Sequence, residues 1–437
     1  MTSVTAPAGG ERIKEGTVKG LAYIDADGNE AVWTDHKKRL WLWGLFVPTA
    51  LFFAVGLMML LGIGSTPLMY LAPVLWWIGP ILMYVILPIV DIKAGDDGEN
   101  PPEEVMEALE NSKYYKWLTY IFLPFQLASL VFMCYLLTAD NLTWLGGVYA
   151  NGGGLGLISQ IGLTLSLGMV AGIAINTGHE LGHKKPENER WIAKLTLAPA
   201  MYGHFFIEHN RGHHVRVATP EDPASGRFGE TFWEFLPRSV WGSLKSSWSL
   251  EKTRLERLGK SPWTLKNDVL NAWIMTVVLF GGLTAVFGWY VLPFLIIQGV
   301  YGFSLLESVN YLEHYGLLRQ KTASGRYERC APKHSWNSDR IITNVFLYHL
   351  QRHSDHHANP TRRYQTLRSF EEAPSLPQGY ATLIGLTYFP PLWRRLMDHR
   401  VLDHYDGDIT KVNIHPRVRD KVLAQYGATT TGEQAAA

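Results

Sequence analysis

The sequence predicts an all-α integral membrane protein, with six transmembrane helices and cytoplasmic helical blocks that carry its histidine motifs. Charged residues and histidines are absent from residues 40–90, 141–178 and 269–306. A stretch of about 20 apolar residues spans the hydrocarbon core of a bilayer, so the first and third of these runs can each hold two helices. A further apolar stretch lies at 117–138, and polar blocks separate the runs.

The limits of the six helices follow from where the apolar runs begin and end. Three glycines at 152–154 form a turn before the fourth helix, and residues 288–293 form a tight hairpin between the fifth and the sixth. The helices are expected at residues 40–62, 68–90, 117–138, 155–178, 269–289 and 292–312.

The distribution of basic residues orients these helices. Lysine and arginine lie next to helix ends at residues 37–39, 184–185 and 319–321, whereas the short loops at 62–67 and 288–293 carry no charge. Basic residues stay on the cytoplasmic side of a membrane. Both termini, and the polar blocks with their histidines, are therefore expected on the cytoplasmic side.

This topology divides the chain into six parts. They are a polar cytoplasmic N-terminus at 1–38, four transmembrane helices at 39–178, a cytoplasmic block at 179–268, two transmembrane helices at 269–314, a second cytoplasmic block at 315–420 and a flexible tail at 421–437.

The composition excludes several classes of function. The net charge is +1, from 40 basic and 39 acidic residues, so there is no basic domain to bind nucleic acid. The first 35 residues are polar and do not form a cleaved signal peptide. Cys134 and Cys330 are the only cysteines, which excludes a disulfide framework, a cysteine-ligated iron-sulfur cluster and a four-cysteine iron site within this chain.

A first histidine motif lies where the fourth helix leaves the membrane, with His179 and His183 on either side of Glu180. Residues four apart on a helix share a face, so the two histidines can converge on one metal ion. The alternative is a pair of interfacial histidines that cap a membrane helix.

Two further motifs and a single histidine favour metal binding over a capping role for these histidines. The second motif, at 208–214, repeats the pair four apart and adds an adjacent histidine, which points about 100° around the helix, so that one helix can serve two metals. The third motif, at 350–357, combines spacings of three and four, and His314 ends the sixth helix. The expected ligands are His179, His183, His209, His213, His214, His314, His353, His356 and His357.

Each motif brings an acidic residue. A carboxylate that accepts the second ring N–H of a ligating histidine fixes its orientation. Glu307 lies two helical turns before His314, where a carboxylate near the membrane needs a partner, although packing against a neighbouring helix explains it equally well. The carboxylates considered for this role are Glu180, Glu208, Glu307, Glu313 and Asp355.

Seven histidines are not expected to bind metal. Two of them lie near the motifs, since His349 is four residues before His353 and His204 is five before His209. The seven are His36, His204, His334, His349, His399, His404 and His415.

The ligand type leaves the metal open, because neutral imidazoles suit iron, zinc, copper or nickel. The number of ligands narrows the choice, because a structural or hydrolytic zinc ion takes three or four from the protein. Two metals with four or five histidines each would leave open positions for a small molecule such as dioxygen.

The motifs together resemble the histidine boxes of the membrane alkane monooxygenases, within the desaturase and fatty-acid hydroxylase superfamily. The matching segments are H-E-L-G-H-K from His179, E-H-N-R-G-H-H from Glu208, N-Y-L-E-H-Y-G-L from Asn310 and L-Q-R-H-S-D-H-H from Leu350. The resemblance extends from about residue 37 to about residue 420, and the third segment separates the alkane monooxygenases from the wider superfamily.

This resemblance implies two non-haem irons held by the nine histidines. The implied reaction is terminal hydroxylation of medium-chain n-alkanes to primary alcohols, with dioxygen and two electrons. The implied electron donor is rubredoxin, reduced by an NADH-dependent reductase, and the implied location is the bacterial inner (cytoplasmic) membrane. The protein is then expected to ligate the irons, to position the substrate and to exclude water. It needs no acid, base or nucleophile of its own for the attack.

Substrate and donor are expected to arrive from different directions. Alkanes concentrate in the bilayer, so a path between the first, second, third and sixth helices is expected, although each lining residue also fits helix packing or contact with lipid. The lining residues considered are Trp76, Trp77, Met83, Phe125, Phe303 and Leu306. An acidic donor would dock on basic residues, for which the candidates are Lys184, Arg211, Arg216, Arg319, Arg352 and Arg362.

Three other functions remain to be separated from this one. A xylene monooxygenase-like enzyme, or a fatty-acyl hydroxylase or desaturase, belongs to the same superfamily. An intramembrane zinc protease would use His179, Glu180 and His183, with the carboxylate as general base, but it leaves most of the other histidines without a role. A metal transporter would place its ligands near the bilayer midplane rather than at helix ends.

Overall fold

The computed structural model describes residues 20–62 and 67–433, and the described chain is mostly helical. Its two strands, β1 (Leu21–Ile24) and β2 (Glu30–Trp33), pair antiparallel with Leu21 opposite Trp33. Most of the predicted N-terminal part, residues 1–19, lies outside the described residues.

Six helical segments of the described chain are long and apolar enough to cross a membrane, which confirms the predicted number. They are Leu40–Gly62, Met69–Ala94, Lys113–Thr138, Leu157–Gly182, Asp268–Phe287 and Trp289–His314. The first segment consists of η1 (Leu40–Leu45) and α1 (Phe46–Gly62), the third is α5 (Lys113–Thr138), the fourth α6 (Leu157–Gly182), the fifth α11 (Asp268–Phe287), and the last joins η9 (Trp289–Val291) to α12 (Leu292–His314).

The second segment changes helix type along its length. A 3₁₀ stretch, η2 (Pro67–Trp77), gives way to α2 (Ile78–Ile81), a π-helical turn η3 (Leu82–Ile86) and α3 (Leu87–Ala94). Proline cannot donate a backbone hydrogen bond, and membrane helices accommodate the lost bond through local 3₁₀ or π geometry. Pro73 and Pro80 lie in the irregular part of this segment.

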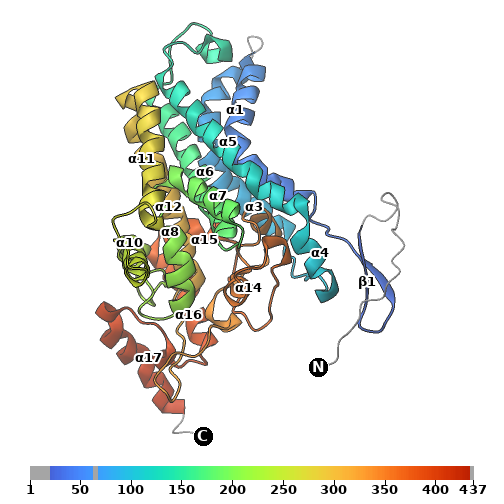
Figure 1. The fold of residues 1–437 in the computed structure, drawn as a ribbon, viewed down its shortest axis with the longest axis vertical. Helices are drawn as coiled ribbons and strands as arrows, with labels where there is room; N and C mark the ends of the chain where they lie inside the picture. Colours follow the sequence, from blue (N-terminus) through green and yellow to red (C-terminus); the bar gives the residue numbers. More distant parts are fainter. Residues whose placement is uncertain (1–19, 63–66, 434–437) are drawn as a thin grey trace.

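The helices α6 and α12 pack together at the centre of the bundle and carry the first motif and His314 at their ends (Figure 1). Their contact depends on small residues. A Cβ at Gly172 would lie 2.9 Å from the Gly302 carbonyl oxygen, and one at Gly302 would lie 3.0 Å from the Gly168 carbonyl oxygen. Glycines at these positions let two membrane helices approach closely, which fixes the histidines at their ends relative to each other.

The remaining helices gather at one end of the bundle (Figure 1). They are α4 (Met106–Asn111), α7 (Glu187–Leu197), α8 (Phe205–Ile207), η8 (Glu208–His213), α9 (His214–Arg216), α10 (Phe232–Arg257), α13 (Ile341–Phe346), α14 (His353–Ala358), α15 (Tyr380–Thr387), α16 (Pro390–His404) and α17 (Arg419–Glu433). Short 3₁₀ turns connect the elements: η4 (Glu103–Val105), η5 (Thr143–Leu145), η6 (Gly147–Tyr149), η7 (Ala198–Ala200), η10 (Pro332–His334), η11 (Tyr364–Thr366), η12 (Ile409–Lys411) and η13 (Pro416–Val418).

The C-terminal segment contains a further helix, and residues 434–437 of the expected tail lie outside the described residues. Residues 421–433 lie in α17, and Val422 in its first turns is buried against the hydrophobic core. An apolar side chain that is removed from water stabilises the segment that carries it, so the burial of Val422 favours the docking of the start of α17.

Candidate metal centre

Five histidines from three separate segments converge in one cluster, called here the five-histidine site. His179 and His183 come from the end of α6, His209 and His214 from the second motif, and His356 from α14. One ligand nitrogen from each lies within 4.8 Å of those of the others. The Nε2 atoms of His179 and His356 are 2.8 Å apart, and those of His214 and His356 are 3.0 Å apart.

The other four predicted ligands form a second cluster, the four-histidine site, made by His213, His314, His353 and His357. The Nε2 atoms of His314 and His353 are 3.1 Å apart, and those of His353 and His357 are 2.9 Å apart. All four histidines are buried, whereas His183 and His214 of the five-histidine site are only partly buried. The four-histidine site is therefore the deeper of the two.

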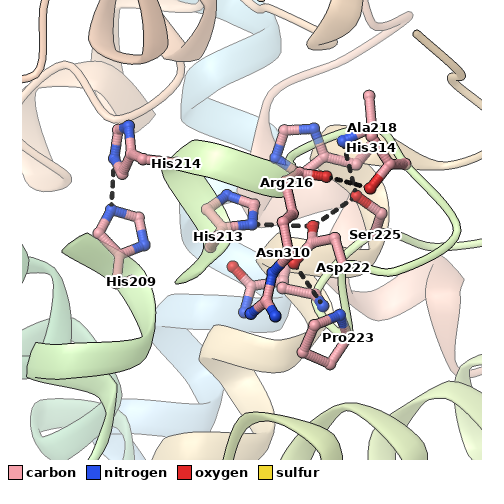
Figure 2. A network of polar contacts seen from close by, with 12 residues as sticks. His209, His213, His214, Arg216, Ala218, Asp222, Pro223, Ser225, Asn310 and His314 are labelled. Atoms are coloured by element: carbon pink, nitrogen blue, oxygen red, sulfur yellow. Dashed lines mark hydrogen bonds and ion pairs between the residues drawn. The ribbon is translucent and has the colours of Figure 1, made fainter. Parts of the chain in front are cut away.

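The second motif contributes to both sites. Its spacing pairs His209 with His213, four residues later, but the two histidines lie in different sites. His209 lies with His214 in the five-histidine site, and their Nε2 atoms are 3.0 Å apart. Residues 208–213 form a π-helical turn, η8, in which the repeat is longer than in an α-helix and residues five apart align. Figure 2 shows His209 and His214 turned toward each other and His213 turned toward Asp222.

The nitrogen positions fit bound metal. A metal–imidazole bond is about 2.1 Å long, so two nitrogens at a right angle around one metal lie about 3.0 Å apart. Three atoms, the Nε2 atoms of His209, His214 and His356, form a triangle with sides of 3.0, 3.0 and 3.4 Å. A neutral imidazole nitrogen offers either one proton or one lone pair, so hydrogen bonds cannot satisfy such a triangle, whereas a cation at its centre would.

Burial favours the neutral form, which metal binding needs, at His209, His356 and His357. Burial, reinforced by the neighbouring histidines, lowers the pKa of His209, His356 and His357 well below the ordinary value. Neutral imidazoles offer lone pairs to a metal, and protonated ones do not. The Nε2 atom of His183 is buried without a hydrogen-bond partner among the described residues, as expected of a ligand atom.

Two carboxylates contact the histidines of the four-histidine site. Asp222 accepts a hydrogen bond from His213 Nδ1 at 2.9 Å and another from the Ser225 hydroxyl at 2.6 Å (Figure 2). A proton on Nδ1 leaves the lone pair of His213 on Nε2, which faces the cluster. Glu313 Oε2 lies 3.2 Å from His353 Nε2, and its other oxygen accepts a hydrogen bond from Tyr380 at 2.8 Å.

The contact of Asp222 with His213 is not predicted from the sequence. Asp222 lies nine residues after His213 in a polar loop with no helical repeat, so no spacing rule connects the two residues. Its flanking residues Pro220 and Pro223 indicate a turn but not its partner.

The other carboxylates considered are held by partners other than the box histidines. Glu180 pairs with Lys184 at 3.0 Å and accepts a hydrogen bond from the Tyr364 N–H, and neither cluster includes its carboxylate. Glu208 pairs with Arg216, Glu307 accepts a hydrogen bond from Tyr202, and Asp355 pairs with Arg362 at 2.9 Å. Burial raises the pKa of Glu208 to about 7, against the opposing charge of Arg216.

The seven histidines not expected to bind metal lie outside both clusters. His349 Nδ1–H donates to the Tyr364 carbonyl oxygen, 2.9 Å away, and the ring belongs to neither cluster. His204 packs edge-on against Tyr202, with a centroid distance of 4.5 Å. His334 pairs with Glu328 through its ring. The backbone carbonyl oxygen of His334 lies 3.3 Å from His314 Nδ1.

Two of the basic residues considered for donor docking are buried, which corrects that expectation. Lys184 is 5% exposed and pairs with Glu180. Arg352 is 1% exposed and donates to the backbone carbonyls of Asp97, Glu99 and Leu367. Both side chains hold the loops around the metal centre rather than face a partner. The other four, Arg211, Arg216, Arg319 and Arg362, are partly exposed.

A narrow apolar cavity lies between α6, α12, the second membrane span, α13 and α15. Met83 and Leu306, two of the six residues considered for the substrate path, line it. The other lining residues are Leu87, Met169, Gly172, Ile173, Asn176, Leu305, Val309, Thr343, Phe346, Leu347, Leu350, Ala381 and Ile384. Its two polar lining side chains already have partners, since Asn176 donates to the Leu347 carbonyl and Thr343 to Asp91.

The remaining four residues considered for the path lie elsewhere. Trp76 is buried and donates to the Tyr149 hydroxyl, and Phe303 stacks on Tyr202 with a centroid distance of 5.1 Å. Trp77 packs against Gly162 of α6, and Phe125 lines a different, open groove at the outer face of the bundle.

Known proteins share this sequence over most of its length. Residues 157–410 match the fatty acid desaturase family. The chain is 45% identical to an alkane 1-monooxygenase of Acinetobacter baylyi, over 90% of this chain and 92% of that protein. It is 44% identical to alkane 1-monooxygenase 1 of Alcanivorax borkumensis and to an alkane 1-monooxygenase of Ectopseudomonas oleovorans, in each case over 92% of this chain and 94% of the relative.

Nine buried or half-buried histidines form two clusters, and His179, His183 and His314 among them lie at the ends of membrane-spanning helices that also line an apolar cavity, in agreement with these similarities. An intramembrane protease and a metal transporter are thereby excluded. The chain belongs to the fatty acid desaturase family and, within it, to the alkane 1-monooxygenases.

Proposed function

We propose that this monooxygenase hydroxylates the terminal methyl group of medium-chain n-alkanes at a pair of irons held by the nine histidines. In the overall reaction an alkane, dioxygen, two electrons and two protons give a primary alcohol and water. The observation that carries the proposal is the apolar cavity between α6 and α12, because these two helices also carry His179, His183 and His314.

The ligand sets proposed for the two irons are those of the two clusters. His179, His183, His209, His214 and His356 would hold one iron, and His213, His314, His353 and His357 the other. When bound, iron supplies the redox chemistry that activates dioxygen and removes hydrogen from an unactivated methyl group. An iron at the four-histidine site would have fewer histidine ligands and therefore more open coordination positions for a small molecule. This site is also the more deeply buried of the two.

The chain's own contribution is to orient the ligands, to place the alkane and to keep water out. Asp222 holds His213 in position through its hydrogen bond to Nδ1, whereas Glu313 contacts His353 at Nε2, the nitrogen that faces the other histidines of the cluster. We propose the cavity as the substrate path, because a saturated chain fits an apolar lining and the two polar donors in it, the Asn176 amide nitrogen and the Thr343 hydroxyl, already donate to protein oxygens.

The proposal is tested by product analysis together with metal content. The full-length protein in lipid nanodiscs should form 1-octanol from octane at a higher kcat/KM than it forms products from xylene or an acyl thioester, and it should bind two irons per chain. His314→Gln should lose activity and iron, and His399→Gln, at an exposed position outside the clusters, should lose neither. Preferred turnover of xylene or of the acyl thioester, or full activity with one iron, would contradict the proposal.

We further propose that rubredoxin delivers the electrons at the surface next to His214. His183 and His214 are the ligands that reach the surface, and the adjacent Val215 is 66% exposed. Arg319 donates to the Val215 carbonyl at 3.0 Å, and Arg216 follows it, so the apolar side chain lies among basic groups that suit an acidic donor. Val215→Glu should raise the KM for rubredoxin and leave the iron content unchanged.

Val32→Glu is the control, because Val32 is 54% exposed and lies on β2, away from the metal centre. Equal KM values for rubredoxin in the two variants would exclude this docking surface.

For the orientation we propose that both termini and the blocks at 179–268 and 315–420 face the cytoplasm, in the bacterial inner membrane. The basic residues beside the helix ends support it. A C-terminal fusion to a reporter that works only in the cytoplasm should be active. Activity of a reporter that works only in the periplasm would contradict this orientation.

A further inference from the structure

A surface hollow of about 540 Å³ lies between α10 and the second histidine motif. Arg211, Arg254 and Arg257 line it together with two hydroxyl side chains, Ser249 and Thr253. Leu250 and Leu258 complete the lining. Guanidinium groups and hydroxyls are the groups that bind phosphate oxygens in proteins.

The charges around this hollow are not balanced. Glu251 is fully buried beneath it and pairs with Arg211 Nη1 at 2.8 Å and with Arg254 Nη2 at 2.6 Å. Arg257 is exposed, and no ion pair or hydrogen bond joins its side chain to the described residues. The three arginines that line the hollow share one paired carboxylate, and Asp268, which also acts on Arg254, is itself paired with Lys194 at 2.7 Å, so the net charge is positive and favours an anion as the occupant.

The hollow lies where a membrane-spanning helix begins. The span α11 starts at Asp268, whose N–H donates to Glu251, and Arg254 donates to the Lys266 carbonyl. Figure 1 shows α10 almost end-on beside the lower end of α11, so that α10 lies across the direction of the spans. A helix placed in this way runs along the membrane surface, as amphipathic interfacial helices do.

The loop between α10 and α11 exposes apolar side chains. Trp263 is 75% exposed, Leu265 is 70% exposed and Leu258 is 56% exposed. Lys260 and Lys266 in the same loop are also exposed. Exposed tryptophan and leucine beside lysines at the end of a span are typical of chain that enters the headgroup region of a bilayer.

We propose that this hollow binds the phosphate of an anionic phospholipid headgroup, with Arg211, Arg254 and Arg257 as ligands and the apolar loop at 258–265 against the acyl chains. A soluble acidic protein also carries negative charge, but the exposed Trp263 and Leu265 favour a lipid. Because Arg211 belongs to η8, between two ligand histidines, the headgroup would contact the turn that carries part of both metal sites.

The test measures lipid affinity in the full-length, metal-loaded protein. Delipidated protein in detergent is titrated with phosphatidylglycerol or phosphatidylcholine of the same acyl chains, and native mass spectrometry counts the bound lipids. The wild-type protein should bind phosphatidylglycerol more tightly. Arg257→Gln should weaken that binding about five-fold, since a basic residue near an anionic membrane surface contributes about that factor.

Two variants serve as controls. Arg257→Lys keeps the charge and should keep most of the affinity, and Arg326→Gln removes an exposed arginine from a loop away from the hollow and should change nothing. Brominated phosphatidylglycerol should quench tryptophan fluorescence less in Trp263→Phe than in the wild-type protein, which locates the lipid. Both measurements are independent of hydroxylase activity.

Three results would overturn the proposal. The first is equal phosphatidylglycerol affinity in Arg257→Gln and wild type. The second is displacement of the lipid by glycerol phosphate at the same concentration, which would make the hollow a site for soluble phosphate. The third is that Arg257→Gln weakens the binding of an acidic donor protein but leaves lipid binding unchanged. This face would then be a protein docking surface.

Discussion

His209 and His214 face each other within the five-histidine site, with their Nε2 atoms 3.0 Å apart, although the α-helical repeat would pair His209 with His213. The π-helical turn η8 makes residues five apart align and sends His213 to the neighbouring site. π-helical turns are rare but are often found at functional sites, and here one such turn lets a single short segment contribute to both histidine clusters.

This division predicts the iron content of double variants. His209→Ala combined with His214→Ala removes two ligands from one site and should leave about one iron per chain, because the four-histidine site is intact. His209→Ala combined with His213→Ala removes one ligand from each site and should lower the occupancy of both. Mössbauer spectra of ⁵⁷Fe-loaded protein distinguish the two cases. Loss of both irons in equal measure from the first variant would contradict the division.

The hydrogen bond between His213 and Asp222 predicts a change in metal affinity. Asp222→Asn keeps the size of the side chain but removes the negative charge that orients and polarises the imidazole. Partners of this kind typically contribute about 10- to 100-fold to metal affinity. Competition with an iron chelator should show such a loss for one of the two irons. Asp408→Asn, which alters an exposed carboxylate in a distant turn, should leave both affinities unchanged.

The cavity predicts a change in chain-length preference. Ile173 lines the cavity on α6, so Ile173→Phe should shorten the space available to the alkane. The ratio of kcat/KM for dodecane to that for octane should fall about ten-fold, the scale on which a pocket discriminates by size. Ile161→Phe, at a position on the same helix that is 41% exposed, is the control. A parallel change in both variants would argue against this path.

The burial of Arg352 predicts a loss of stability rather than of docking. Its guanidinium donates to three backbone carbonyls that tie the third motif to residues 97–99 and to residue 367. Arg352→Gln leaves these acceptors without a donor and should lower the free energy of unfolding by about 3 kcal/mol. A fall in Tm, with unchanged KM for rubredoxin, is expected. Arg395→Gln, at an exposed position on α16, should shift Tm little.

The six spans and the histidines that gather in the two clusters could be predicted from the sequence because their signals are local. An uncharged run long enough to cross a bilayer is visible without knowledge of its neighbours, as for Leu157–Gly182. His179 and His183 share a face of a regular helix, and both lie in the five-histidine site as their spacing predicts.

Only the tertiary structure decided how the second motif divides its histidines, which carboxylates reach them and which basic residues face solvent. The turn η8 departs from the α-helical repeat, Asp222 reaches His213 through a loop without periodicity, and Lys184 and Arg352 are buried against segments distant in the chain. Spacing along a chain encodes the faces of regular helices, whereas these contacts arise where separate segments meet. The sequence therefore determined the spans and the ligand types, and packing determined their partners.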